Sequence, residues 1–298
     1  MNEPAMTTTF QSETGKLLSV VIKPAANAMY SEEQIRNEWQ SLNFLDAPDR
    51  DRALAEYHAF EKILLDHHIR VRHLSPDESL TMDSMYCRDA SILTDQGAIL
   101  CRMGKSSRCG EPEAAGALFY EMDIPILGKI KSPGTVEGGD VAWLNNRTLA
   151  VGHTYRTNLD GIRQLKDMLD PLGVKVIVAD LPHFRGPTDV FHLMSILSPV
   201  ADDLAVVYAP LMPIAFRLTL LELGYQLIEV PEVEFNRIGC NVLALAPRVC
   251  LMVEGHPQTQ ARLQAAGCTV LTYAGEEISI KGGGGPTCLT RPLKRSMV

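Results

Sequence analysis

Residues 50–102 read RDRALAEYHAFEKILLDHHIRVRHLSPDESLTMDSMYCRDASILTDQGAILCR, and they contain one complete structural unit. Apolar residues recur at helical spacing in the first part: Leu54, Tyr57, Phe60, Ile63 and Leu64. The predicted parts are, in order, a helix over 50–67, a strand over 69–74, a polar loop to Asp89, and a hairpin of strands 91–94 and 98–102. The unit is therefore helix, strand, loop and hairpin.

The same unit recurs at roughly 50-residue intervals. Its further copies begin with predicted helices over 113–122, 158–169, 213–223 and 257–266. The second to fourth copies end in predicted hairpins over 141–151, 193–208 and 242–253. The last copy has no hairpin of its own, and we expect Leu289–Pro292 to complete one with the N-terminal strand Leu18–Ile22. Such repeats share a core with their neighbours, and the split copy predicts closure into a ring.

The residues just before the hairpins occupy equivalent places in the five units: Asp89, the turn Glu137–Asp140, His192, Asn241 and Cys288. If the hairpins surround one axis, two acids, a base and a nucleophile meet in a small volume. Each residue alone also has an ordinary structural explanation: a turn at Glu137, a core histidine at His192, an ion pair between Asp89 and Arg88. Their shared register favours a functional site.

The loop Lys281–Pro292, KGGGGPTCLTRP, delivers Cys288 after four glycines. Glycines suit backbone that takes positive φ or lies against a ligand, so the loop is predicted to line a pocket with Cys288 as the reactive centre. The alternative is a flexible surface loop with an incidental thiol. A phosphate-binding loop is excluded because the chain ends before the helix that it needs, and the spaced glycines of a dinucleotide site are absent.

The composition favours a small cationic ligand. The chain has 298 residues, 46% of them hydrophobic, with 28 basic against 36 acidic residues and a net charge of −8. This balance disfavours nucleic acid and anionic membranes as partners. We expect a flexible polar N-terminus over 1–16 and a single catalytic domain over 17–298.

Two absences bear on where the protein is found. The sequence lacks an 18-residue apolar run and a hydrophobic signal core, which predicts a cytoplasmic protein. Seven cysteines without a C-x-x-C pair predict reduced thiols. The oligomeric state stays open, a homo-oligomer included.

Several motifs together resemble the guanidino-group-modifying superfamily, which includes arginine deiminases, amidinotransferases and dimethylarginine dimethylaminohydrolases. The matching motifs are Asp83-x-x-Tyr86-x-Arg88-Asp89, Arg108, Glu137-Gly-Gly-Asp140, Arg156-Thr-Asn158, His192-Leu193 and Gly-Gly-Gly-Pro-Thr-Cys288. The resemblance covers about Leu18 to Pro292 and implies an α/β fold, the five-bladed α/β-propeller known as a pentein.

The resemblance also implies roles for these residues. Cys288 would be the nucleophile, His192 the general acid and base, and Glu137 and Asp89 the acids that hold a guanidinium. Arg108 and Arg156 resemble the positions that bind a substrate carboxylate, and Asp83 one near the substrate amine. Tyr86 and Asp140 belong to the same motifs and are expected on the substrate side.

The chemistry agrees with these roles. A guanidinium is a planar cation that two carboxylates can orient, leaving its central carbon to a thiolate. Attack would give a covalent adduct, the histidine would protonate the departing amine, and water would release the product. No metal or organic cofactor is required. A zinc site is the alternative for such a residue set, but clustered ligand spacings are absent.

Substrate choice depends on the residue two positions after His192. Deiminases and amidinotransferases would carry an acid there, whereas this chain has Met194, which favours a dimethylarginase-like hydrolase. Against this, Arg88 follows the deiminase pattern, and Thr287 stands where many relatives carry histidine. A deiminase, an amidinotransferase with an amine as acceptor, and a hydrolase of another N-substituted arginine stay open. A non-catalytic propeller that binds partners at its rim is the alternative from a different class.

Overall fold

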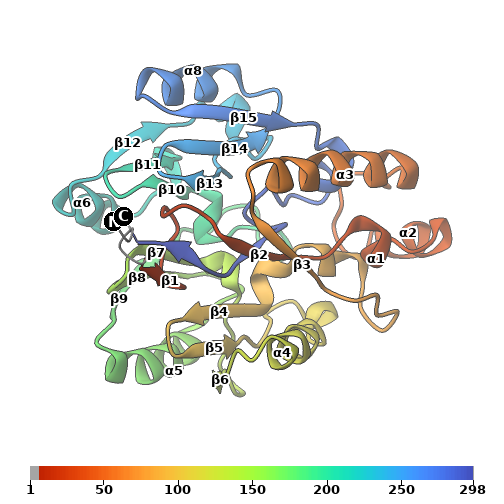
Figure 1. Ribbon diagram of the computed structural model, residues 1–298, viewed down its shortest axis with the longest axis horizontal. Helices are drawn as coiled ribbons and strands as arrows, with labels where there is room; N and C mark the ends of the chain where they lie inside the picture. The colour runs from red at the N-terminus through yellow and green to blue at the C-terminus, as the bar shows by residue number, and fades with distance from the viewer. Residues whose placement is uncertain (1–6, 298) are drawn as a thin grey trace, which may run out of the picture.

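Five three-stranded sheets, which we call blades, are arranged in a ring (Figure 1). They belong to a computed structural model that describes residues 7–297. In every blade the first two strands are antiparallel and the second and third are parallel. The repeat predicted from the sequence is confirmed, and the fold is the five-bladed α/β-propeller.

The blades follow one another along the chain. Blade 1 holds β16 (Arg291–Pro292), β2 (Ser19–Ile22) and β3 (Arg70–His73); blade 2 holds β4 (Ser91–Thr94), β5 (Gly97–Leu100) and β6 (Ile126–Lys129). Blade 3 holds β7 (Val141–Asn145), β8 (Thr148–His153) and β9 (Lys175–Asp180); blade 4 holds β10 (Leu197–Ala201), β11 (Leu204–Val207) and β12 (Gln226–Glu229). Blade 5 holds β13 (Leu243–Ala246), β14 (Val249–Val253) and β15 (Thr269–Tyr273).

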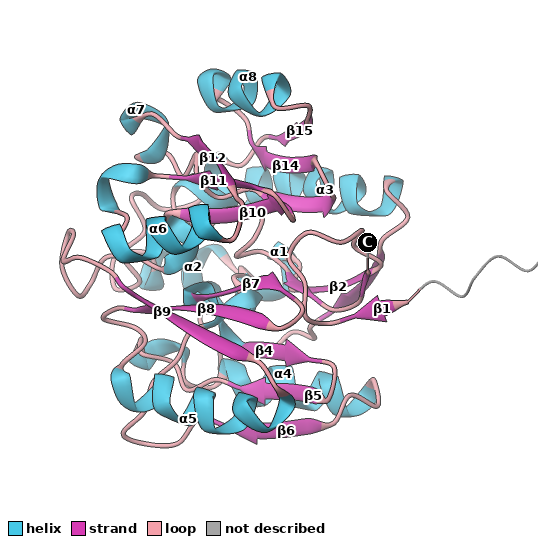
Figure 2. Cartoon of the chain, turned by 90° about the vertical axis from the view of Figure 1, so that its left-hand side faces the viewer, coloured by secondary structure: helices cyan, strands magenta, loops and turns pink. Residues whose placement is uncertain are grey.

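The connection between the second and third strands of each blade contains one helix of nine or more residues, which lies on the outside of the ring (Figures 1 and 2). In blade order these helices are α3 (Arg50–Asp66), α4 (Glu111–Glu121), α5 (Leu159–Leu169), α6 (Ile214–Glu222) and α8 (Pro257–Ala265). Side-chain caps set two of the starts: Asp49 accepts from the backbone N–H of Arg52, and Asn158 accepts from that of Gly161.

Burial falls from the axis outward. The first two strands of the blades are almost entirely buried, as in β4, β5 and β11. The third strands, such as β3 and β6, consist of partly buried and exposed residues. The hairpins therefore form the wall of the ring's interior, and the residues at their starts lie where side chains from all blades can meet.

Shorter elements complete the chain. They are helices α1 (Ala25–Ala28), α2 (Glu32–Glu38) and α7 (Glu232–Phe235), a π-helical turn over Glu276–Ile280, and the paired strands β1 (Thr8–Thr9) and β17 (Arg295–Ser296). Among residues 7–297, no helix is long and apolar enough to cross a membrane.

The first blade is split between the two ends of the chain, as expected. Arg291 pairs with Val21, so the C-terminal strand completes the sheet that the N-terminal strand begins. The backbone N–H of Met297 also donates to the Thr7 carbonyl at 2.8 Å. The ring is thus closed by hydrogen bonds between the ends of the chain.

Two predictions are corrected. The expected flexible N-terminus is wrong for residues 7–16, because β1 pairs with β17 and Glu13, buried, forms an ion pair with Arg88 at 2.5 Å; residues 1–6 lie outside the described part, as does residue 298. The hairpin strand predicted from residue 193 begins only at Leu197. The backbone N–H of His192 donates to the Ser195 hydroxyl, and the backbone N–H of Ser195 donates to the His192 carbonyl, which fixes a 3₁₀ turn over Leu193–Ser195 instead.

Candidate active site

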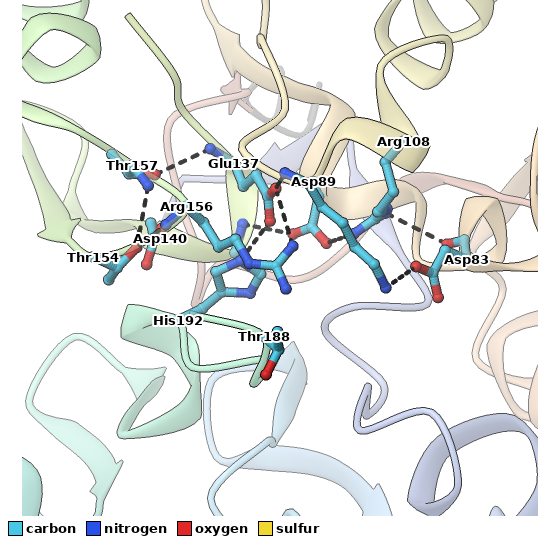
Figure 3. A network of polar contacts seen from close by, with 12 residues as sticks. Asp83, Asp89, Arg108, Glu137, Asp140, Thr154, Arg156, Thr157, Thr188 and His192 are labelled. Carbon is cyan, nitrogen blue, oxygen red and sulfur yellow. Dashed lines mark hydrogen bonds and ion pairs between the residues drawn. The ribbon is translucent and has the colours of Figure 1, made fainter. Parts of the chain in front are cut away.

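The pre-hairpin residues of four blades meet at one cavity, which we call the narrow cavity. It measures about 20 Å³. Its lining includes Asp89, Glu137, His192 and Cys288, and it continues with Asp83, Tyr86, Lys105, Arg108, Arg156, Val190 and Gly282–Gly284. The convergence expected from the repeat register is therefore present in the fold. Figure 3 shows the carboxylates of Asp89 and Glu137 and the imidazole of His192 turned toward one another.

The glycine loop fits closely around Tyr86. A Cβ on Gly282 would lie 1.9 Å from the Tyr86 hydroxyl, and one on Gly284 would lie 2.5 Å from its ring. Gly283 has φ +75°, which side chains rarely adopt. Tyr86 itself is buried and donates its hydroxyl to the Ile278 carbonyl at 3.1 Å. The loop that delivers Cys288 thus requires glycine for both shape and conformation.

The Cys288 thiol is buried and receives a polar contact from the residue that precedes the hairpin of blade 5. Asn241 directs its amide Nδ2 to the sulfur at 3.4 Å, and its Oδ1 accepts from the backbone N–H and hydroxyl of Thr287 at 3.0 and 2.8 Å. Burial, together with the negative charge of Asp89, raises the pKa of Cys288 above its ordinary value, although the Thr287 and Asn241 contacts oppose this. The resting group is a thiol at neutral pH.

His192 and Glu137 form a buried pair. The imidazole Nε2 lies 2.8 Å from Oε2 of Glu137. Burial disfavours charge on the imidazole, but the carboxylates of Asp140, Asp89 and Glu137 outweigh it and raise the pKa of His192. Burial also opposes charge on Glu137, and the hydrogen bond and charge of His192 overcome it and lower the pKa of that carboxyl. The histidine is therefore a proton donor in the resting site.

Asp89 is held by a buried arginine, though not by its sequence neighbour. Arg88 points away to Glu13, whereas Arg108 donates to Asp89 Oδ2 at 2.5 Å. Arg108 also donates twice to Glu111, at 2.8 and 2.7 Å, and to the Tyr86 carbonyl at 2.9 Å. Burial raises the pKa of Glu111 to about 7 despite Arg108. With these partners Arg108 positions Asp89, and because it also lines the narrow cavity, its expected role toward a substrate carboxylate stays a prediction.

The Arg156 side chain has fewer partners within residues 7–297 than the Arg108 side chain. Its guanidinium is buried, lies 3.7 Å from Glu137 Oε1 and leaves Nε without a partner among the described residues. It lines the narrow cavity, so its free donors are available to an anionic group there. This geometry agrees with the expected carboxylate-binding role.

Lys105 was not singled out by the sequence. Its Nζ lies 2.6 Å from Asp83 Oδ2 and donates to the Leu42 carbonyl, and its backbone N–H donates to Glu137 Oε1 at 2.9 Å. No motif marks a lone lysine in a loop. Asn241 was identified by register but not by its contact with the sulfur.

Asp140 lies elsewhere than expected, whereas Met194 lies beside Cys288 and His192. Asp140 does not line the narrow cavity, because its carboxylate accepts from the Leu193 backbone at 3.0 Å and the Thr154 hydroxyl at 2.7 Å behind His192. Its expected place on the substrate side is therefore wrong, and burial raises the pKa of Asp140 to about 6. Met194 lines a second cavity of about 140 Å³, which we call the wide cavity. Cys288 and His192 line both cavities.

Asp89, Glu137 and His192 also form a set that could hold a metal ion. Their ligand atoms lie within 4.8 Å of one another. Asp89 Oδ2 is already bonded to Arg108, and Glu137 Oε2 to His192. The set suits a cation held by carboxylates, and an organic cation with several N–H donors satisfies it as well as a metal does.

The raised pKa of Cys288 predicts slow alkylation at neutral pH. Since the thiolate is the reactive form, the rate of its alkylation by iodoacetamide should keep rising above about pH 9.5, where the rate for an ordinary thiol with a pKa of about 8.5 levels off. Mass spectrometry of quenched samples would follow the labelled peptide, with Cys288→Ser as the blank. A plateau below pH 8 would contradict the arrangement described here.

Comparison with known proteins agrees with the site. The model of the family "N,N dimethylarginine dimethylhydrolase, eukaryotic" matches residues 25–295. The N(G),N(G)-dimethylarginine dimethylaminohydrolase of Pseudomonas aeruginosa is 28% identical over 83% of this chain and 90% of its own length. An uncharacterized protein of Bacillus subtilis, YkgA, is 27% identical over 97% and 96%. An arginine deiminase of Listeria welshimeri is 27% identical over 70% and 61%.

Solved structures share the fold. The Pseudomonas aeruginosa dimethylarginine dimethylaminohydrolase, complexed with citrulline, superposes with a TM-score of 0.76 at 22% identity and covers 92% of this chain and 98% of its own. The N-terminal domain of a cyanobacterial arginine dihydrolase, ArgZ, bound to its substrate, gives 0.77 at 20% identity with 92% and 97% covered.

Proposed function

The chain belongs to the N,N dimethylarginine dimethylhydrolase family of guanidino-group-modifying enzymes, and we propose that it hydrolyses N-alkylated arginine, dimethylarginine included, to citrulline and the free amine. The observation that carries the choice of substrate is the place of Met194. It lines the wide cavity beside Cys288 and His192, while the paired acids Asp89 and Glu137 line only the narrow one.

Binding begins with the guanidinium between Asp89 and Glu137. These carboxylates accept its unsubstituted N–H groups, since a guanidinium presents its donors in a fixed plane. Arg156, with free donors in the same cavity, takes the substrate carboxylate, and Asp83 with Lys105 lies at the amine. The positive charge now beside Cys288 favours its thiolate, which the resting site disfavours.

The reaction proceeds through Cys288 and His192. The thiolate forms a bond to the guanidinium carbon, the bond from that carbon to the alkylated nitrogen breaks, and His192 gives its proton to the departing amine. The adduct is a thiouronium. Water, deprotonated by the now neutral His192, adds to the same carbon and expels the thiolate. Substrate plus water gives citrulline plus amine, and the enzyme is restored.

A substrate panel tests the proposal. Arginine, its monomethyl, dimethyl and hydroxyl derivatives, and agmatine would each be incubated with the full chain, and ureido product and released amine quantified. We expect the N-methylated arginines to have the highest kcat/KM. Faster release of ammonia from arginine would instead make the chain a deiminase, and transfer to an added amine would make it an amidinotransferase.

Met194→Asp should shift the preference toward arginine. A carboxylate at this place can accept from an unsubstituted terminal nitrogen, but dimethylation removes those donors and leaves the acid buried and unpaired, at about 1–3 kcal/mol. The ratio of kcat/KM for dimethylarginine to that for arginine should therefore fall by roughly 5- to 150-fold. Met194→Leu, which keeps an apolar side chain, is the matched control. Equal ratios in all three proteins would show that residue 194 does not contact the substrate.

A further inference from the structure

The two cavities adjoin one another and differ in the side chains that line them. Six charged residues line the narrow cavity: Asp83, Asp89, Lys105, Arg108, Glu137 and Arg156. The wide cavity has a mixed lining: Phe184, Phe191, Met194, Phe235, Ile238 and Ile280 form the apolar part of its wall, and Asn43, Arg185, Thr188, Asp189, Asn236 and Lys281 are polar. Because Cys288 and His192 belong to both, the bond that breaks lies at the boundary between the two sides.

This division fixes where a substituent on the guanidinium must go. The unsubstituted nitrogens face Asp89 and Glu137, so the remaining nitrogen faces His192, the group that protonates it. A carbon chain on that nitrogen then enters the wide cavity, whose lining includes Met194 from the turn that follows His192.

The wide cavity is larger than two methyl groups need. It measures about 140 Å³, close to the roughly 150 Å³ of an apolar cavity that accommodates a benzene molecule. The basic residues on its lining already have partners. Arg185 donates to Asn236 Oδ1 at 2.6 Å and lies over the Phe184 ring, and Lys281 is bonded to Glu277 at 2.6 Å.

We propose that the wide cavity is a subsite for the leaving amine and that the enzyme cleaves arginines whose terminal nitrogen carries an alkyl or arylmethyl group of about four to seven carbons. This inference rests on the proposed function and extends it to a class of larger substrates. The bonds formed and broken are those given above, and the products are citrulline and the corresponding primary amine.

A homologous series measures the size of the subsite. The substrates are arginines bearing N-methyl, N-propyl, N-butyl or N-benzyl on one terminal nitrogen, and released amine and citrulline are both quantified. Each additional buried carbon should raise kcat/KM about fourfold until the cavity is filled. N-butyl should therefore exceed N-methyl by up to roughly 60-fold. A decline from N-methyl to N-butyl would overturn the inference.

A filling variant tests the location of the subsite. Thr188 is exposed on the lining of the wide cavity, so Thr188→Trp should preserve the fold and reduce the space. The N-butyl to N-methyl ratio of kcat/KM should fall at least tenfold, whereas Thr269→Trp, on an exposed position outside both cavities, should leave it unchanged.

Two other outcomes separate failure of this inference from failure of the proposed function. If Thr188→Trp lowers kcat/KM for all substrates equally, the wide cavity is the entry route or holds the α-amino acid end, and the inference is wrong. If the native protein cleaves no N-alkylated arginine at all, including N-methyl, the proposed function itself fails.

Discussion

Cys288→Ser is expected to abolish turnover and to leave substrate binding measurable. The serine hydroxyl has no accessible anionic form at neutral pH, so the bond to the guanidinium carbon cannot form, while Asp89, Glu137 and Arg156 still hold the substrate. Loss of a nucleophile costs on the order of 10⁴- to 10⁶-fold in kcat. Quenched assays of citrulline formation would measure the rate, and calorimetric titration with dimethylarginine would measure the affinity.

The chain offers a control for this replacement. Cys109 is an exposed cysteine that lines neither the narrow nor the wide cavity, so Cys109→Ser should keep full activity. Retained activity in Cys288→Ser would rule out covalent catalysis. Loss of binding together with turnover would instead indicate that the substitution disturbs the glycine loop around Tyr86.

His192→Ala should lower kcat by about 10²- to 10⁴-fold, the usual contribution of a positioned acid and base. Two steps lose their proton carrier, protonation of the leaving amine and deprotonation of water. If the second step becomes the slower one, the thiouronium adduct accumulates, and intact-protein mass spectrometry would detect the added mass on Cys288. The adduct distinguishes a catalytic role from a loss of folding.

A histidine at the surface provides a control variant for His192→Ala. His153 is paired with Asp180 at 2.9 Å and lies outside both cavities, so His153→Ala should not change kcat. Activity of His192→Ala within threefold of the native enzyme would contradict the assignment, and the buried imidazole would then serve only to hold Glu137.

The repeat could be predicted from the sequence because each unit contains its own helix periodicity and turn residues. The helix over 50–66 and the hairpin at 91–100 follow from side-chain periodicity and turn residues within the unit. Equivalent positions of equivalent units then had to converge once the ring closed. That reasoning located Asp89, Glu137, His192 and Cys288 without any knowledge of contacts.

The sequence did not predict which side chains pair with one another across the ring. Arg88 and Arg108 are both buried arginines, and only the fold shows that Arg88 bonds with Glu13 while Arg108 bonds with Asp89. The polar residues over 7–16 suggested a segment exposed to solvent. Glu13 is instead buried, and its charge neutralises that of the buried Arg88. Lys105 likewise depends on a loop conformation that no periodic pattern encodes.

The split first blade has a consequence for how activity first appears in a newly made chain. Strand β2 is synthesised before the strands of the other four blades and β16 after them, and pairings between residues far apart in sequence are the slow ones to form. Cys288 precedes β16 by only a few residues. A chain synthesised only as far as blade 5 therefore carries Asp89, Glu137 and His192 without Cys288, and the thiol joins the site together with the strand that closes the ring.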